Sequence, residues 1–383
     1  MKKEYLLSPG PTPVPPEALL VMAQPMIHHR TPQFQQVFDE VTSGLKDVFC
    51  TKSDLITLFG SGTSAMEAAV VNSCDVGDKA LVVRGGKFGE RWGEICKAYG
   101  IPFTAIDIAW GTAVKPEQIA SALQADPSIA AVFVTLVETS TGVLTDVKAI
   151  GEIMKSTNAL LAVDGVSGVG AVECRVDDWG IDLLAVGSQK ALMIPPGLAY
   201  ISVSAKAWKK IETVKRGRYY LDLLKHRKAT QKGDPAFTPP VSLFLAQAKT
   251  LAMIRAEGIE NVWKRVSKLA GAMRLAVEAM GLKQFSQAPA DCLTTVLMPA
   301  NVDGEKVMKH MRDVQGVTPA GGQDQLKGKI IRFASMGYVD QFDILVGLVA
   351  LANALAAQNA EVKLGAGVEA FVKELRPSPS GGG

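Results

Sequence analysis

Three separated segments carry the residues whose types and spacing could do chemistry. The first is the glycine-rich turn GSGTS at 60–64, which follows an apolar run and precedes a helical pattern. Such a turn leaves backbone N–H groups free at the start of a helix, where phosphate binds well. The hydroxyls of Ser61, Thr63 and Ser64 suit a phosphate monoester. The spacing also fits a dinucleotide motif, and an ordinary tight turn would have the same composition.

The second segment ends in an acidic residue. Asp164 closes the apolar run 160–163. A carboxylate at the carboxyl end of a buried parallel strand faces the crevice where open α/β sheets bind their ligands. An ionised carboxylate in that place needs a cationic partner. A helix-capping aspartate would fit the same sequence.

The third segment contains a lysine in apolar surroundings. Lys190 follows the apolar run 183–186 and leads into ALMIPPG at 191–197. Burial disfavours the charged ammonium and lowers its pKa from the ordinary value of about 10.4. The neutral amine is then available as a nucleophile, as in Schiff-base formation with a carbonyl compound. Most lysines are solvated surface groups, and the apolar neighbours distinguish this one.

The three segments together match the needs of one cofactor. Pyridoxal 5′-phosphate requires a phosphate cradle, an acid beside its ring nitrogen and a lysine for the Schiff base. The turn at 60–64, Asp164 and Lys190 supply these three elements. We therefore predict a pyridoxal-phosphate site.

The elements that must position these residues alternate along the first 240 positions. Short apolar runs occur at 55–59, 80–83, 130–137, 159–163, 183–186 and 199–203, and helical patterns occur at 34–48, 64–74, 91–99, 116–123, 150–155 and 176–179. Apolar runs interleaved with helices predict an α/β fold with a mostly parallel sheet covered on both faces.

The pattern changes after Pro240. Long helices are predicted at 241–256 and 260–280, followed by short strands at 294–298 and 330–333 and helices at 304–312 and 341–358. This order predicts a smaller α+β domain. We expect an N-terminal arm at 1–16, a large cofactor-binding domain at 17–260, a small domain at 261–365, and a tail at 366–383 that is disordered at its end.

Composition excludes several classes of protein. The 383 residues are 48% hydrophobic with a formal net charge of +3, which argues against disorder and gives no reason to expect a nucleic-acid or membrane partner. No apolar run is long enough to span a membrane, and the start lacks the apolar core of a secretion signal. Five cysteines without a CxxC motif and four histidines without metal-ligand spacing predict free thiols, no metal site and a cytoplasmic location.

The sequence resembles the class V aminotransferases of pyridoxal-phosphate fold type I, in particular the alanine–glyoxylate and serine–pyruvate aminotransferase group. The matching segments, in the family's order, are LLSPGPTPVPP at 6–16, FGSGTSAMEAA at 59–69, GGKFGERW at 85–92, ETSTGV at 138–143, AVDGVSGVG at 162–170, VGSQKALMIPPG at 186–197, FTPPVSL at 237–243 and GKIIRFASMG at 328–337.

This resemblance implies a fold, an assembly and a reaction. The implied fold is a large domain with a mostly parallel, seven-stranded-type sheet between helices, plus a smaller C-terminal α+β domain. The implied assembly is a homodimer with shared active sites. The implied reaction moves an amino group from a small amino acid, such as serine, alanine or aspartate, to a 2-oxo acid such as glyoxylate or pyruvate.

The family's roles around the cofactor ring carry over to matching positions. Lys190 resembles the lysine that binds the cofactor and shuttles a proton, and Asp164 resembles the partner of the pyridinium nitrogen. Val166 and Phe88 match the residues on the two faces of the ring, although some relatives have tryptophan in place of Phe88. Thr139 matches a hydroxyl residue near the phenolic oxygen of the ring.

The remaining roles concern phosphate and substrate. The residues that match the phosphate site are Ser61, Gly62, Thr63 and Gln189. Thr238 resembles a residue that reaches the phosphate from the neighbouring subunit, but Pro235 stands where relatives often have a tyrosine with the same task. Arg332 resembles the arginine that holds the substrate α-carboxylate, and Gly10 would let the backbone approach the substrate.

Three alternatives stay open at this point. A cysteine desulfurase or related lyase would use a mobile cysteine and usually a histidine before the lysine, where this chain has Gln189. A nicotinamide-dependent oxidoreductase would use the glycine turn at 60–62, but no acidic residue follows the next strand to hold a ribose. A catalytically silent relative, such as the members of this group once named hydrogenase subunits, would have no need of Lys190.

Overall fold

The centre of the molecule is a seven-stranded sheet. The computed structural model describes residues 3–376. The strands lie in the order β2 (Asp54–Gly60), β10 (Gly197–Val203), β9 (Leu183–Gly187), β8 (Leu160–Asp164), β5 (Ile129–Thr135), β3 (Lys79–Arg84) and β4 (Phe103–Asp107). Only β10 runs antiparallel to its neighbours, so the sheet is mostly parallel, as the sequence predicts.

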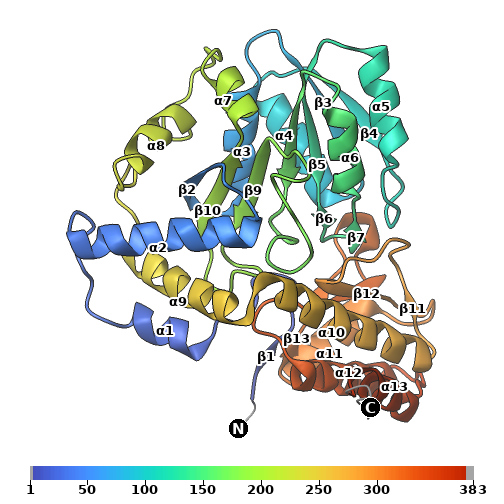
Figure 1. Ribbon diagram of the computed structural model, residues 1–383. Helices are drawn as coiled ribbons and strands as arrows, with labels where there is room; N and C mark the ends of the chain where they lie inside the picture. The colour runs from blue at the N-terminus through green and yellow to red at the C-terminus, as the bar shows by residue number, and fades with distance from the viewer. Residues whose placement is uncertain (1–2, 377–383) are drawn as a thin grey trace, which may run out of the picture.

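Helices cover both faces of this sheet (Figure 1). One face packs on α2 (Pro32–Phe49), α5 (Pro116–Ala125) and α6 (Val147–Met154), and the other packs on α3 (Gly62–Ser73), α4 (Lys87–Ala98), α7 (Ala205–Ile211) and α8 (Leu223–Thr230). In β8, Leu161 and Val163 belong to the first core and Leu160 and Ala162 to the second. This alternation of apolar residues toward two cores explains why the strands read as continuous hydrophobic runs.

The N-terminal arm runs from the small domain toward the large one. Its strand β1 (Tyr5–Leu6) pairs in parallel with β13 (Val317–Thr318). Helix α1 (Pro16–Met22) then begins with a proline in its first turn, a position where the missing N–H costs nothing. The short strands β6 (Val137–Glu138) and β7 (Val143–Leu144) form a hairpin directly after β5.

Two long helices lead to the small domain. They are α9 (Val241–Glu257) and α10 (Ile259–Ala279), separated by Gly258 at φ +83°. An antiparallel sheet follows, in the order β11 (Lys283–Gln284), β12 (Leu293–Leu297), β15 (Ile330–Ala334) and β14 (Ala320–Gly321). The helices of this part are α11 (Gly304–Asp313), the 3-10 turn Asp324–Leu326, α12 (Gln341–Ala356) and α13 (Leu364–Leu375). No helix within residues 3–376 combines the length and apolar character needed to cross a membrane.

Two of the sequence predictions are wrong in the structure. The helix expected at 176–179 is a turn, which Gly180 closes at φ +64°. Residues 366–375, assigned to the tail, belong to α13, which packs against α10 and buries Phe371 completely. Gly365 and Gly367 obscure that helix in the sequence, because glycine is a poor helix former. The rest of the expected tail, from residue 377, lies outside the described residues.

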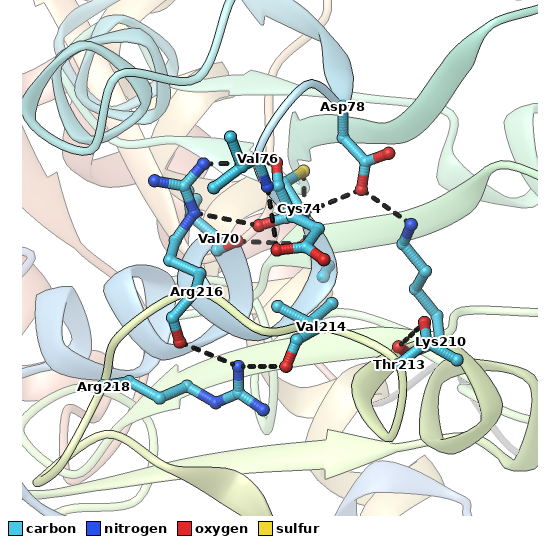
Figure 2. Close-up of polar contacts among 11 residues, drawn as sticks. Val70, Cys74, Val76, Asp78, Lys210, Thr213, Val214, Arg216 and Arg218 are labelled. Carbon is cyan, nitrogen blue, oxygen red and sulfur yellow. Dashed lines mark hydrogen bonds and ion pairs between the residues drawn. The ribbon is translucent and has the colours of Figure 1, made fainter.

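An arginine fixes the segment that follows α7 (Figure 2). Arg216 donates from Nε to the Cys74 carbonyl at 3.1 Å, from Nη2 to the Asp75 carbonyl at 3.2 Å, and from Nη1 to the Tyr99 carbonyl. These carbonyls belong to the loops that end α3 and α4, whose last C=O groups lack intrahelical partners. Arg216 therefore anchors the chain between α7 and α8 to the two helices that begin at the candidate site.

Candidate active site

One cavity of about 250 Å³ collects most of the predicted site residues at the carboxyl edge of the sheet. This volume is near the lower end of the roughly 300–1,000 Å³ typical of ligand sites. The predicted residues in its lining are Gly10, Ser61, Gly62, Thr63, Phe88, Thr139, Asp164, Val166, Gln189 and Lys190. Residues that the sequence analysis did not single out complete the lining: Pro11, Met66, Arg91, Ser167 and Pro196.

The N-terminal arm closes the cavity over Lys190. The Nζ of Lys190 donates to the Pro9 carbonyl at 2.7 Å, and Thr12 Oγ1 donates to the Lys190 carbonyl at 2.8 Å. Gly10 has φ +144°, and a Cβ at this position would lie 2.0 Å from Nζ. Only glycine therefore fits here, and its backbone approaches the lysine directly.

Burial sets the protonation of Lys190. Desolvation, followed by the nearby charge of Arg332, lowers the pKa of the amine to about 8. At neutral pH an appreciable fraction of the amine is then neutral, unlike an exposed lysine. This property was predicted from the apolar neighbours of Lys190, and the nucleophile it creates faces the cavity.

Asp164 lies at the end of β8 and is almost completely buried, at 3% exposure. Its Oδ1 accepts the Val166 N–H at 2.9 Å, whereas no hydrogen bond from the described residues reaches Oδ2. Burial raises the pKa of Asp164 to about 7, against the lowering effect of the Val166 N–H, and the charge of Glu138 raises it further. A cationic N–H brought against the free oxygen would reverse this shift.

The glycine turn forms the opposite wall. Ser61 caps α3 without a side-chain hydrogen bond, and the Ser64 N–H bonds the Ser61 carbonyl, which leaves the N–H groups of Gly62 and Thr63 at the helix start for a ligand. A Cβ at Gly62 would lie 2.5 Å from Val166 Cγ2, so glycine is needed for this approach. Gln189 Oε1 is buried here without a hydrogen-bond partner. A helix N-terminus, a buried lysine and a buried carboxylate around one cavity fit the group that the sequence predicts, pyridoxal phosphate.

Glu138 positions the predicted stacking residue Phe88, a role that sequence reasoning missed. Its Oε2 accepts the N–H of Phe88 at 3.0 Å and that of Gly89 at 2.8 Å, while Ser140 donates to Oε1. Burial raises the pKa of Glu138 and these donors oppose the change. The Glu138 carboxylate, at the end of β6, thus caps α4 and fixes the position of the Phe88 side chain.

Two predicted residues lie outside the cavity lining. Arg332 is buried at 6% exposure and donates from Nη1 to the Thr139 carbonyl at 2.9 Å, and from Nε and Nη2 to the Gly321 carbonyl. Thr139 lines the cavity, so the guanidinium lies directly behind this wall. Thr238 is exposed, and its predicted role concerns the site of a neighbouring subunit.

The buried charge of Lys190 gives a stability prediction. The pKa of the amine is about 8 in the folded chain and 10.5 in the unfolded chain. Burying the charged amine therefore destabilises the fold by its full amount below pH 8, and this destabilisation disappears above pH 10.5. We expect Lys190→Met to raise the unfolding free energy of the cofactor-free protein by roughly 2–3 kcal/mol at pH 7, and by about 1 kcal/mol or less at pH 10.

Denaturant unfolding at the two pH values measures this effect. Lys206→Met is the matched control, since Lys206 pairs with Asp182 at the opposite end of the strands. An increase in the unfolding free energy of Lys190→Met that does not depend on pH, or no increase at pH 7, would contradict the conclusion that the buried charge of Lys190 destabilises the fold.

The fold and the site together define a class of protein. The structure superposes with a TM-score of 0.93 on pyridoxamine–pyruvate aminotransferase from Mesorhizobium loti, at 28% sequence identity, covering 98% of this chain and 97% of that one. The architecture is therefore that of the fold-type I pyridoxal-phosphate enzymes, as predicted.

Sequence comparison then gives the family. The model of the class-V aminotransferases (Aminotransferase class-V) matches residues 4–324. The chain is 34% identical to the serine–glyoxylate aminotransferase of Methylorubrum extorquens, over 98% of this chain and 97% of the relative. It is 43% identical to a soluble hydrogenase 42 kDa subunit of Anabaena cylindrica, over 97% and 98%. This protein belongs to the class-V aminotransferase family and is a transaminase.

Proposed function

We propose that this aminotransferase uses pyridoxal 5′-phosphate to move the amino group of a small amino acid to glyoxylate or pyruvate, with serine, alanine and aspartate as the candidate donors. The observation that carries the proposal is the gathering of ten predicted residues in one cavity around Lys190 and Asp164. The names of the relatives from Methylorubrum extorquens and Mesorhizobium loti support serine as donor and glyoxylate or pyruvate as acceptor.

In this proposal the chain's residues divide the work. When bound, the cofactor supplies an electron sink for the bond pair released at the substrate Cα. Asp164, whose Oδ2 accepts no hydrogen bond from the described residues, would hold a proton on the ring nitrogen of a bound cofactor. Lys190 would hold the cofactor and would accept the Cα proton at Nζ, and the pKa of its free amine, about 8, is well matched to neutral pH. Pro9 and Gly10 keep water from Nζ.

Arg332 is the proposed receptor for the substrate α-carboxylate. A guanidinium has five N–H donors, and the Thr139 and Gly321 carbonyls engage three of them. One donor on Nη1 and one on Nη2 stay free, which suits a bidentate carboxylate contact. Among the ion pairs of the described residues none involves Arg332, and the charge of Glu138 offsets its burial only in part, because the pKa of Arg332 is lowered to about 10.

Assembly and location belong to the same proposal. From the resemblance to the class V aminotransferases we infer a homodimer in which Thr238 contacts the phosphate in the neighbouring subunit's site, and the exposed position of Thr238 outside the cavity of its own chain is compatible with that role. Pro235 offers no hydroxyl for a second contact of this kind. All five cysteines are free, which fits a cytoplasmic protein. Cys292 is fully buried, which argues against the mobile nucleophile of a desulfurase.

The test is the first half-reaction, donor by donor. Purified protein saturated with pyridoxal phosphate is mixed with L-serine, L-alanine or L-aspartate, and the visible absorption band is followed. We expect one L-amino acid to bleach the band at least about tenfold faster than the others and to leave pyridoxamine phosphate, while its D-enantiomer does nothing. Addition of glyoxylate or pyruvate should then restore the band.

Other outcomes are equally informative. A protein that shows no visible band with added pyridoxal phosphate would overturn the proposed cofactor. A band that no amino acid bleaches would favour the catalytically silent alternative. The Anabaena cylindrica relative, whose name is that of a hydrogenase subunit, is the reason to test for this outcome.

A further inference from the structure

Arg91 is a cation on the cavity wall with no acidic partner. It lies in α4, one helical turn after Phe88, and lines the cavity. Its Nη1 donates to Thr63 Oγ1 at 3.2 Å, and its guanidinium carbon lies 4.8 Å from the centroid of the Phe88 ring. None of the ion pairs formed by residues 3–376 includes Arg91. Burial raises the pKa of Asp164 in the same cavity lining and the charge of Arg91 opposes this rise, but with a single hydrogen bond to a hydroxyl Arg91 retains N–H donors for an anion.

The place of that charge relative to α3 identifies the anion. Thr63 stands in the first turn of α3, where backbone N–H groups and the helix dipole favour a phosphate. The other two cations near the cavity have different roles in the proposed function, Lys190 as the amine that holds the cofactor and Arg332 as the receptor for the substrate α-carboxylate. A phosphate monoester carries about two negative charges at neutral pH, and Arg91 is the cation on its side of the cavity.

Arg91 also orders the two groups that it touches. A hydroxyl has one O–H donor and two acceptor lone pairs. Because Arg91 occupies an acceptor position of Thr63, the O–H of Thr63 is free to donate to an anion at the helix terminus. The guanidinium likewise covers one face of Phe88, which leaves the other face for a second planar group.

We propose that Arg91 is the cationic component of the cofactor's phosphate site and the residue that positions Thr63 and Phe88 within it. This inference rests on the proposed function, since the phosphate is that of pyridoxal phosphate. It assigns to the α4 side of the cavity a charge that neutralises the phosphate, in addition to the hydroxyl and amide donors at Ser61, Thr63 and Gln189.

The test compares ligands with and without a phosphate. Cofactor-free wild type, Arg91→Gln and Arg91→Lys are titrated calorimetrically with pyridoxamine 5′-phosphate and with pyridoxamine, neither of which needs to react with Lys190. Loss of a charged hydrogen bond should raise the dissociation constant of pyridoxamine phosphate by roughly 10–100-fold in Arg91→Gln. Pyridoxamine should change by less than about threefold. Arg91→Lys keeps a charge without the planar fork and should fall between.

A second measurement isolates the anion itself. Inorganic phosphate should compete with pyridoxamine phosphate for the wild type, and this competition should weaken about tenfold or more in Arg91→Gln. Arg84→Gln is the matched control, because Arg84 pairs with Asp107 at the sheet edge and does not line the cavity. It should bind all three ligands as the wild type does.

Two outcomes of the titrations would contradict the role proposed for Arg91. Equal weakening of both pyridoxamine ligands would mean that Arg91 acts only by packing on Phe88, and no change in either would mean that it has no role. If Arg91→Gln fails to fold by circular dichroism, Arg91→Lys is used for both the ligand titrations and the phosphate competition. A wild type that binds neither ligand would overturn the proposed function itself. That outcome differs from one in which the wild type and Arg91→Gln bind both ligands equally, which would overturn only the role of Arg91.

Discussion

Lys190→Ala is expected to lose transamination almost completely, with kcat/KM falling by roughly 10⁴-fold or more. Two tasks end with the removal of one amine, since Lys190 both attaches the cofactor and takes the Cα proton in the proposed mechanism. No other described amine takes its place, because Lys190 is the one lysine in the lining of the cavity. Steady-state kinetics with the preferred donor would measure the loss, and the absorption band of the bound cofactor should change from that of the lysine Schiff base to that of the free aldehyde.

The control for this variant is Lys206→Ala. Lys206 also stands near the sheet, but it donates to the Ala159 carbonyl and pairs with Asp182 at the amino ends of β8 and β9. It should keep wild-type turnover. Substantial residual transamination in Lys190→Ala, with wild-type unfolding behaviour, would refute the assignment of Lys190.

The pKa of Lys190 adds a pH signature to the same assignment. Only the neutral amine attacks a carbonyl, and the pKa of this amine is about 8. The rate at which cofactor attaches to cofactor-free protein should therefore rise as the pH increases through 8 and level off above it. An exposed lysine would instead give a rate that still climbs at pH 10.

The reacting residues of the site could be predicted from the sequence, because each ends a recognisable element. Asp164 and Lys190 follow apolar runs, and the carboxyl ends of parallel strands meet at one edge of a sheet. The turn at Ser61 is recognisable from its glycines and hydroxyl residues. The resemblance then added Phe88, Thr139, Val166 and Gln189, which carry no strong signal of their own, and all of these line the same cavity.

The supporting residues were missed for a physical reason. The sequence analysis began the helix after the GGKFGERW segment at Arg91, whereas α4 begins at Lys87. With the true start, Phe88 and Arg91 are three residues apart on one helix and face the same side. Glu138 was missed because the N–H groups that stabilise it begin α4, about 50 residues earlier in the sequence, and no local pattern reveals that contact.

The fold was predictable where burial is two-sided and obscure where it is partial. The central strands β5, β8 and β9 read as continuous apolar runs because both of their faces are covered. Strand β4 lies at the sheet edge, is only partly buried and has no such pattern in its sequence FTAID. Short helices such as α8 are mostly polar, so helical periodicity did not reveal them.

Arg332→Ala is expected to lower kcat/KM by about 10²–10³-fold for every α-amino acid and every 2-oxo acid, chiefly through KM. All these substrates share the α-carboxylate, and Arg332 presents to it two free donors and a buried charge that is only partly offset. An amine without that carboxylate, such as ethanolamine in place of serine, should react in the first half-reaction at the rate it has with the wild type. Arg332→Lys should recover part of the loss, since charge returns without the bidentate fork.

The matched control is Arg255→Ala, because Arg255 is exposed and pairs with Asp47 far from the cavity lining. It should leave every rate unchanged. Because Arg332 also satisfies the buried carbonyls of Thr139 and Gly321, its loss costs stability as well, so the variant must first be shown to unfold cooperatively. Loss of a carboxylate receptor must impair the reaction of every substrate that has the α-carboxylate and spare the amine that lacks it. A defect confined to one donor, or an equal defect with ethanolamine, would therefore show that Arg332 shapes the site without binding the carboxylate.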